Sequence, residues 1–292
     1  MPVVSFIVAG FMKSGTTTLN DYLLLNDKIT MCTPKEPQFF SRDYDEGIEY
    51  YESLWQSDTK VCGEASTCYS RWPFYKDVPK RIAAYNPKMK LIFIMRHPVE
   101  RAYSHYKHNV MIDGCSYRSF SEALEFSDEI LMTSKYMKQV SQFLEYFPKE
   151  QVLLVDFDEL IHHGEEVINR VNDFIGVEGI IKHAQDNTIV SNSAGVVASK
   201  NYIINIINKI RNNIIVSFIF NKVVKLENRK KIRKNIEKSL RDSFLLAICN
   251  SIKLNKFKQL LPDERTNLLA KLREDTEELE IFWNKDLSKW KV

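Results

Sequence analysis

Short apolar runs alternate with amphipathic segments along most of the chain. The runs are rich in branched and aromatic side chains, which predicts buried β-strands, and they lie at residues 6–10, 29–33, 60–64, 90–95 and 151–156. Apolar positions recur with helical spacing elsewhere, which predicts helices that start near residue 19 and that cover residues 48–55, 74–85, 99–111, 120–126, 136–147, 165–175 and 264–282. This alternation predicts an α/β fold: a central parallel sheet flanked by helices in three layers, with a mostly helical C-terminal part.

The pattern contains no glycine-rich or proline-rich linker and no internal repeat, so it predicts a single domain over residues 1–292. The core is expected at residues 3–185. A polar loop and a basic helical segment follow at about 187–250, and a closing region at 262–292. With 44% hydrophobic and 27% charged residues, the chain can build a sizeable core and is not disordered overall.

The first predicted strand runs into a short turn that contains two glycines. Gly10 ends the strand, Gly15 closes the turn, and Lys13 and a run of three threonines accompany it. At such a strand–turn–helix junction, backbone N–H groups and the positive end of the helix dipole favour an anion. The sequence therefore predicts a P-loop-like phosphate-binding loop.

Two departures separate this loop from the loop that binds nucleoside triphosphates. The G-x-x-x-x-G spacing is kept, but Thr16 holds the usual lysine position and Lys13 lies inside the loop. The strand at 90–95 ends in Arg96, where a magnesium-dependent kinase needs an acidic residue. A basic residue suits a second phosphate better than a metal ion, so no metal is expected to be required. The loop, Arg96 and Glu64 all follow strands, and one crevice beyond the strand ends is expected to hold them.

Three segments in this order resemble motifs of the sulfotransferases that use 3′-phosphoadenosine 5′-phosphosulfate (PAPS). Gly-Phe-Met-Lys-Ser-Gly-Thr-Thr-Thr-Leu at residues 10–19 resembles their 5′-phosphosulfate loop, and Arg-His-Pro-Val-Glu-Arg-Ala-Tyr-Ser at 96–104 resembles their 3′-phosphate motif. Lys-Glu-Pro-Gln-Phe-Phe at 35–40 resembles the branch that acts on glycans, including heparan sulfate sulfotransferases and many bacterial relatives, and Gly-Glu-Ala-Ser at 63–66 resembles bacterial members. The resemblance runs from about residue 4 to the C-terminus and is strongest before residue 110.

The resemblance implies a donor site for PAPS, with adenosine 3′,5′-bisphosphate (PAP) as the product. Lys13 would stabilise the charge of the departing phosphate. The side chains and amides that would hold the 5′-phosphate belong to Ser14, Gly15, Thr16, Thr17 and Thr18. Arg96 and Ser104 would grip the 3′-phosphate, and Lys200 would belong to the segment that closes over the nucleotide. The structural alternative for Arg96 is an ion pair with Glu100 or Asp156.

The resemblance also implies that Glu36 is the general base that takes the proton of the acceptor. The remaining residues expected at the acceptor site are Lys35, Arg42, Glu64 and Trp72. Three alternatives stay open: Glu64 is a rival base, Glu36 forms only a salt bridge with Lys35 or Arg42, or a histidine of the segment 105–108 takes the proton.

These features predict a sulfotransferase that modifies a hydroxyl or amino group of a carbohydrate, such as a capsular or surface glycan. The alternative acceptor is a small molecule or a lipid. From other classes, the alternatives are a P-loop nucleotide kinase and a non-catalytic nucleotide-binding protein, and magnesium-independent activity would exclude the kinase.

Charge and hydropathy add little about partners. The net charge of +3 is too small to imply binding of nucleic acid. Basic residues crowd the segment 200–241, which predicts a solvated helical face, a groove for an anionic glycan, or a patch that contacts a membrane surface. The N-terminus lacks the features of a signal peptide, and no apolar run approaches the ~20 residues needed to span a bilayer, so a cytoplasmic enzyme is expected.

Overall fold

The computed structural model describes residues 3–55, 61–111, 113, 115–178, 257 and 260–292. The chain divides into two compact units, with residues 1–110, 116–191 and 260–292 in the first and residues 111–115 and 192–259 in the second. Nearly all described residues belong to the first unit, and the architecture below is that of this unit by itself. The expected polar loop and basic segment at about 187–250, with Lys200, lie outside the described residues. Their roles and the single-domain organisation therefore stay predictions.

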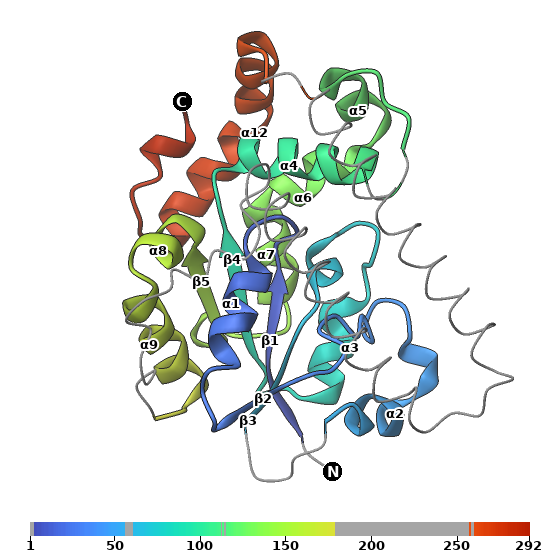
Figure 1. Ribbon diagram of the computed structural model, residues 1–292, viewed down its shortest axis with the longest axis vertical. Helices are drawn as coiled ribbons and strands as arrows, with labels where there is room; N and C mark the ends of the chain where they lie inside the picture. Colours follow the sequence, from blue (N-terminus) through green and yellow to red (C-terminus); the bar gives the residue numbers. More distant parts are fainter. Residues whose placement is uncertain (1–2, 56–60, 112, 114, 179–256, 258–259) are drawn as a thin grey trace, which may run out of the picture. The chain divides into compact units, whose positions relative to one another are not determined.

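A five-stranded, all-parallel sheet runs through the described residues in the order β2-β3-β1-β4-β5 (Figure 1). Its strands are β1 (Val4–Gly10), β2 (Ile29–Met31), β3 (Val61–Ala65), β4 (Lys90–Met95) and β5 (Val152–Asp156). Strand β1 is central, with β3 on one side and β4 on the other. The chain leaves β1 toward β2 and β3 and later continues to β4 and β5 on the opposite side. Beside β1 the strand order therefore reverses, and parallel sheets bind ligands at such a point.

Helices follow or connect the strands. Those described are α1 (Thr16–Leu23), α2 (Ile48–Ser53), α3 (Val78–Tyr85), α4 (Pro98–Met111), α5 (Phe120–Phe126), α6 (Asp128–Ser134), α7 (Tyr136–Leu144), α8 (Phe157–His162), α9 (Gly164–Ile175) and α12 (Pro262–Trp283). In Figure 1, α1, α8 and α9 lie together near β5 and β1, whereas α7 and α12 lie near each other.

Two apolar clusters cover the two faces of the sheet. Successive residues of β4 point to opposite faces, so Phe93 joins one cluster while Ile92 and Ile94 join the other. Helices α1, α8 and α9 supply the cluster that contains Ile92, and α3, α7 and α12 supply the cluster that contains Phe93. Helices on both faces of a parallel sheet confirm the predicted three-layer α/β fold.

The apolar pattern places each described strand within two residues of its observed bounds. The differences concern helices. Residues 74–77 form a turn, and α3 begins only at Val78 because Pro79 is favourable in the first turn of a helix. Helices α6 and α8 are not predicted. The start of α8 follows β5 without a loop, and the Asp156 carboxylate caps it by accepting from the Asp158 amide at 2.8 Å.

Candidate functional site

The glycine loop connects β1 to α1 at the carboxyl edge of the sheet. The Phe11 amide donates to the Ile94 carbonyl at 2.9 Å, which fixes the start of the loop against β4. Lys13 and Gly15 both adopt the left-handed region, with φ of 68° and 96°. A Cβ atom on Gly15 would lie 2.3 Å from Cδ2 of Phe157, so glycine is required there for both conformation and space. The loop is therefore tightly determined by its neighbours.

A hydroxyl of this loop is buried at the start of a helix. Ser14 is fully buried, and its side chain forms a hydrogen bond with that of Tyr136, which acts to lower the pKa of the phenol against the larger, raising effect of burial. Because a hydroxyl hydrogen can rotate, the Ser14 side chain can also donate to a ligand at the start of α1. Thr16 and Thr18 are also nearly buried, and Thr17 is half-buried. The loop thus fits an anion such as the 5′-phosphosulfate of PAPS.

Arg96 follows β4 and reaches toward the loop. Its Nη1 atom lies 3.5 Å from the Lys13 carbonyl oxygen, and its guanidinium packs over the Phe157 ring at 5.8 Å. Its Nη2 atom lies 4.0 Å from a carboxylate oxygen of Glu100, whose other oxygen accepts from Arg265 at 2.8 Å. The side chain of Arg96 is 25% exposed, so the group that was expected to bind the 3′-phosphate stays accessible. Ser104, eight residues further along the chain on α4, is almost buried.

Glu36 lies in the loop that follows β2 and is held by two side chains. Its Oε1 atom pairs with Nζ of Lys35 at 3.0 Å, and its Oε2 atom accepts from the Thr67 hydroxyl at 3.1 Å. The carboxylate side chain is 32% exposed, so it can be reached from solvent. The salt bridge with Lys35, weighed above as the alternative for Glu36, is thus present and does not cover the carboxylate.

Lys35 connects the two parts of the site. The same Nζ atom that pairs with Glu36 also donates to the Thr17 hydroxyl on the first turn of α1 at 3.3 Å. One ammonium group therefore joins the residue expected to take the acceptor proton to the loop expected to hold the donor.

Glu64 is a fully buried carboxylate behind the Glu36 segment. It accepts from the hydroxyls of Tyr51 at 2.6 Å, Ser66 at 2.6 Å and Tyr69 at 2.9 Å. Burial raises the pKa of Glu64 to about 7, although hydrogen bonds from these three hydroxyls act to lower it. A carboxylate so enclosed is removed from direct contact with solvent.

The hydroxyls that bind Glu64 also hold the main chain of the Glu36 segment. The Gln38 amide donates to Oγ of Ser66 at 3.1 Å, and the Phe40 amide donates to the Tyr69 hydroxyl at 3.2 Å. Gln38 adopts a positive φ of 54°, which is uncommon for a residue other than glycine. Glu64 is therefore connected to the Glu36 segment through two relays, Ser66 and Tyr69, and its role toward an acceptor stays a prediction.

Two further residues expected at the acceptor site, Arg42 and Trp72, contact neighbours outside the Glu36 segment. Arg42 is exposed, and its Nε atom donates to the Tyr75 hydroxyl at 3.0 Å. Trp72 exchanges two hydrogen bonds with the amide side chain of Gln139, at 2.7 Å and 2.9 Å, and Nζ of Lys138 lies 5.1 Å from its ring centre. Their roles toward an acceptor stay predictions.

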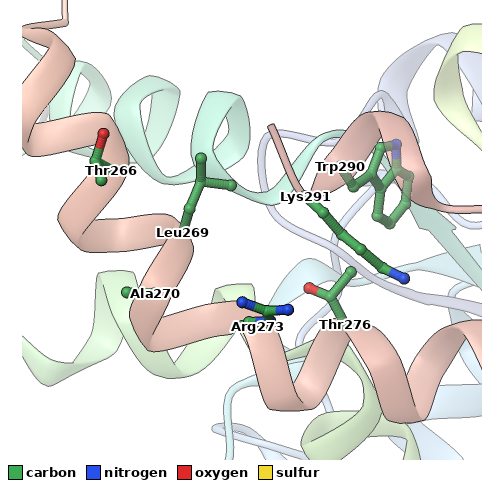
Figure 2. A pocket seen from close by; sticks show the side chains of 7 residues that line it. All are labelled: Thr266, Leu269, Ala270, Arg273, Thr276, Trp290 and Lys291. Atoms are coloured by element: carbon green, nitrogen blue, oxygen red, sulfur yellow. The ribbon is translucent and has the colours of Figure 1, made fainter.

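A separate cavity lies beside α12 and the C-terminal residues (Figure 2). It has a volume of about 320 Å³ and is lined by Thr266, Leu269, Ala270, Arg273, Thr276, Trp290 and Lys291. Its two cations are already paired, Arg273 with Glu277 at 2.9 Å and Lys291 with Glu280. None of the residues predicted to bind donor or acceptor lines this cavity.

The part of the chain that the structure describes contains no group of three side chains able to hold a metal ion. Within the same part, no helix is long and apolar enough to cross a membrane.

Sequence reasoning missed the residues that support the site from behind. Thr67, Ser66 and Tyr51 are not predicted to act there, although Ser66 and Thr67 directly follow the Glu64 strand. Tyr69 is expected from the sequence as one of the aromatic residues that could line an acceptor platform or pocket, and in the structure its hydroxyl donates to Glu64. Arg101 was also missed. Its signal is helical spacing, because it lies three residues after Pro98 and four before His105, on the face of α4 that is buried.

Comparison with known proteins agrees with the geometry. A family model described as "Sulfotransferase domain" matches residues 5–253. Human heparan sulfate glucosamine 3-O-sulfotransferase 3B1 is 29% identical over 185 residues, which cover 60% of this chain and 46% of that protein. Human bifunctional heparan sulfate N-deacetylase/N-sulfotransferase 3 is 30% identical over 192 residues, which cover 59% of this chain and 22% of that protein. This chain thus matches less than half the length of these curated relatives.

One solved structure extends the comparison to the whole chain. A sulfotransferase from Alicyclobacillus acidocaldarius superposes with a TM-score of 0.65 at 22% identity, covering 100% of this chain and 99% of that one. At this identity the likeness shows a shared fold.

Proposed function

Because the chain belongs to the sulfotransferase family, we propose that it transfers a sulfuryl group from PAPS to a hydroxyl or amino group of a carbohydrate. One observation carries the proposal: the glycine loop, an accessible Arg96 and an accessible Glu36 follow the strands β1, β4 and β2 of one parallel sheet, on its carboxyl side. Lys35 links the loop to Glu36 through Thr17. PAPS, when bound, supplies the activated sulfuryl group and leaves as PAP.

The residues of the donor side bind and neutralise anions. The Ser14 hydroxyl, the amides of the loop and the threonines of α1 are available for the 5′-phosphate, and Arg96 and Ser104 for the 3′-phosphate. Lys13, inside the loop, brings the positive charge that stabilises the phosphate left behind after transfer. This assignment needs no metal ion, because cations and a helix terminus already face the anions.

On the acceptor side, Glu36 takes the proton of the attacking hydroxyl or amine. Its Oε2 atom is oriented by Thr67 and its Oε1 atom by Lys35, so the carboxylate is held in one direction while it stays reachable. The buried Glu64 positions this segment through Ser66 and Tyr69. Glu64 then acts through its neighbours, not as the base.

The acceptor class rests on the named activities of the relatives. Both act on heparan sulfate, one at a glucosamine 3-hydroxyl and one at an amino group. A glycan that contains amino sugars is therefore the acceptor we propose, and O- and N-sulfation are the two outcomes to distinguish. A small-molecule or lipid acceptor is the second candidate.

The test is transfer of labelled sulfate from PAPS to an unsulfated heparan backbone and to its N-deacetylated form, without added metal. Label in either polysaccharide, absent with Glu36→Gln, is the expected result. If neither polysaccharide is labelled but a lipid or phenol is, the acceptor is a small molecule or a lipid instead of a glycan. Transfer of phosphate from ATP, with no transfer from PAPS, would remove the sulfotransferase proposal.

A further inference from the structure

Arg101 is a fully buried arginine behind the glycine loop. Its Nη1 atom donates to the Met12 carbonyl oxygen at 3.4 Å and to Nδ1 of His105 at 3.2 Å. Its Nε atom donates to the Ser134 hydroxyl at 2.8 Å, and its Nη2 atom to the Ile130 carbonyl oxygen. All four acceptors are neutral, so the guanidinium has hydrogen bonds but no counter-charge from them.

The surroundings do not supply that counter-charge. Among the described residues, no carboxylate forms an ion pair with Arg101. The Tyr136 phenol acts to raise the pKa of Arg101, and the cations of Arg96 and Arg71 act to lower it. Burial lowers the pKa of Arg101 to about 10, so the side chain remains protonated at neutral pH. A buried charge that has hydrogen bonds but no counter-charge is still costly.

His105 responds to the same charge. Burial, and then the Arg101 cation, lower the pKa of His105 to about 2, so the imidazole is neutral and can accept from Arg101. Its Nε2 atom is buried and has no partner within the described part of the chain. The cluster of Arg101, His105 and Ser134 thus carries one net positive charge under the loop.

We propose that Arg101 is a positioning residue of the donor site, and that its buried positive charge is balanced by the anionic groups of the bound nucleotide. It would act in two ways. Its hydrogen bond to the Met12 carbonyl fixes the peptide next to Lys13, and its charge raises the affinity of the loop for anions from behind. The inference rests on the donor site proposed above, and it assigns to Arg101 a contribution that depends on charge as well as on shape.

The first test compares Arg101→Met with Arg101→Lys by calorimetric binding of PAP and of adenosine. Methionine fills much of the space without charge, and we expect PAP affinity to fall by at least about tenfold, the size of a charge-assisted interaction. Lysine keeps the charge and should recover most of the affinity, while adenosine binding stays unchanged in both variants. Wild-type PAP affinity in Arg101→Met would overturn the proposal, as would equal losses in the two variants.

A second pair of variants keeps Arg101 and changes only its charge balance, which covers the case that Arg101→Met does not fold. Ser134→Asp would place a carboxylate beside Nε of Arg101, and Ser134→Asn is the neutral control of the same size. We expect Ser134→Asp to bind PAP at least about tenfold more weakly than Ser134→Asn, since the cation already has a partner. Equal PAP affinity in these two variants would contradict the proposal.

Arg96→Ala separates this inference from the donor site itself. If Arg96→Ala weakens PAP binding and the Arg101 and Ser134 variants do not, the proposed donor site is supported and the proposed role of Arg101 is refuted. If the wild-type protein does not bind PAP, both the donor site and the role of Arg101 are refuted.

Discussion

The donor and acceptor sides of the site are supported by buried charges of opposite sign. Behind the donor loop lies Arg101, a cation that has only neutral acceptors among the described residues. Behind the acceptor segment lies Glu64, an acid that accepts from three hydroxyls. The difference follows the task that we propose for each side. A positive charge that is left unbalanced raises the affinity of a loop for an anion. A segment that presents a base instead needs its carboxylate held in a fixed orientation.

The two sides also differ in how the main chain is fixed. On the donor side, conformation is forced locally by Gly15 and Lys13 in the left-handed region. On the acceptor side, the Gln38 and Phe40 amides are held by hydroxyls that belong to another strand end. Local conformation is visible in a sequence motif, and long-range relays are not.

The largest effect is expected from a substitution that changes the acceptor side alone. Glu36→Gln should lower turnover by about 10²–10⁴-fold, because a general base is lost, while PAP binding stays near wild type. Single-turnover assays and calorimetry on the same preparation measure the two quantities. Glu49→Gln, at an exposed position of α2, is the matched control and should have wild-type turnover. Turnover that survives in Glu36→Gln would show that Glu36 is not the base.

The next substitution changes the donor side alone. Gly15→Ala places a Cβ atom 2.3 Å from Phe157 at a φ of 96°, and we expect it to weaken PAP binding and to destabilise the fold by more than about 2 kcal/mol. Gly47→Ala is the control, because Gly47 also has a positive φ but has nothing within 4 Å of the added atom. Thermal unfolding and PAP calorimetry should separate the two variants. Equal PAP affinity in the two variants would mean that the close contact between Gly15 and Phe157 does not affect binding of the donor.

The pH dependence of stability sharpens the contrast between the buried charges. The folded-state pKa of Glu64, about 7, lies above its ordinary value of 4.5, so the stability that protonated Glu64 contributes is present below pH 4.5 and is lost as pH rises through 7. Wild type should therefore lose about 2 kcal/mol more than Glu64→Gln between about pH 5 and about pH 7.

Urea denaturation at the two pH values gives this difference. Groups common to both proteins, such as Asp275, whose pKa burial raises to about 6, cancel in it. Parallel pH profiles for the two proteins would refute the assignment to Glu64. Arg101, with a pKa of about 10, should add no step in this range.

The smallest expected effect concerns the link between the two sides. Lys35→Met removes the contacts to Thr17 and Glu36, which are partly exposed, so we expect turnover to fall by up to about tenfold. Lys80→Met, an exposed lysine of α3, is the control and should behave as wild type. A loss in turnover with unchanged PAP affinity would place Lys35 with the acceptor side, and a loss in PAP affinity would place it with the donor side.

Much of the fold could be predicted because its elements have simple periods. Strands β4 and β5 are apolar runs buried by helices on both faces, and their bounds follow from the sequence to within one residue. Helix α8 could not be predicted in this way, since six residues are too few to show a period. Its start is instead signalled by the capping Asp156.

That the glycine loop and Arg96 lie together was also foreseeable, because each follows a strand of one parallel sheet. The contacts of the buried residues around the site could not be predicted. That Ser66 meets the Gln38 amide, or that Arg101 meets the Met12 carbonyl, depends on how separate segments pack, and no local pattern encodes it. Glu64 shows the consequence: its position at a strand end predicts a role at the site, but its burial and its connection to the Glu36 segment are visible only in the structure.

The central claim, that the glycine loop and Arg96 form a site for PAPS, is tested most directly by calorimetric binding of PAP and of ATP without magnesium. Wild type should bind PAP more tightly than ATP, and Arg96→Ala should bind PAP about 10- to 100-fold more weakly, the usual range for hydrogen bonds between charged groups. Arg170→Ala, at an exposed arginine of α9, should bind PAP as wild type does. Preference for ATP, or PAP binding that is indifferent to Arg96, would contradict the account.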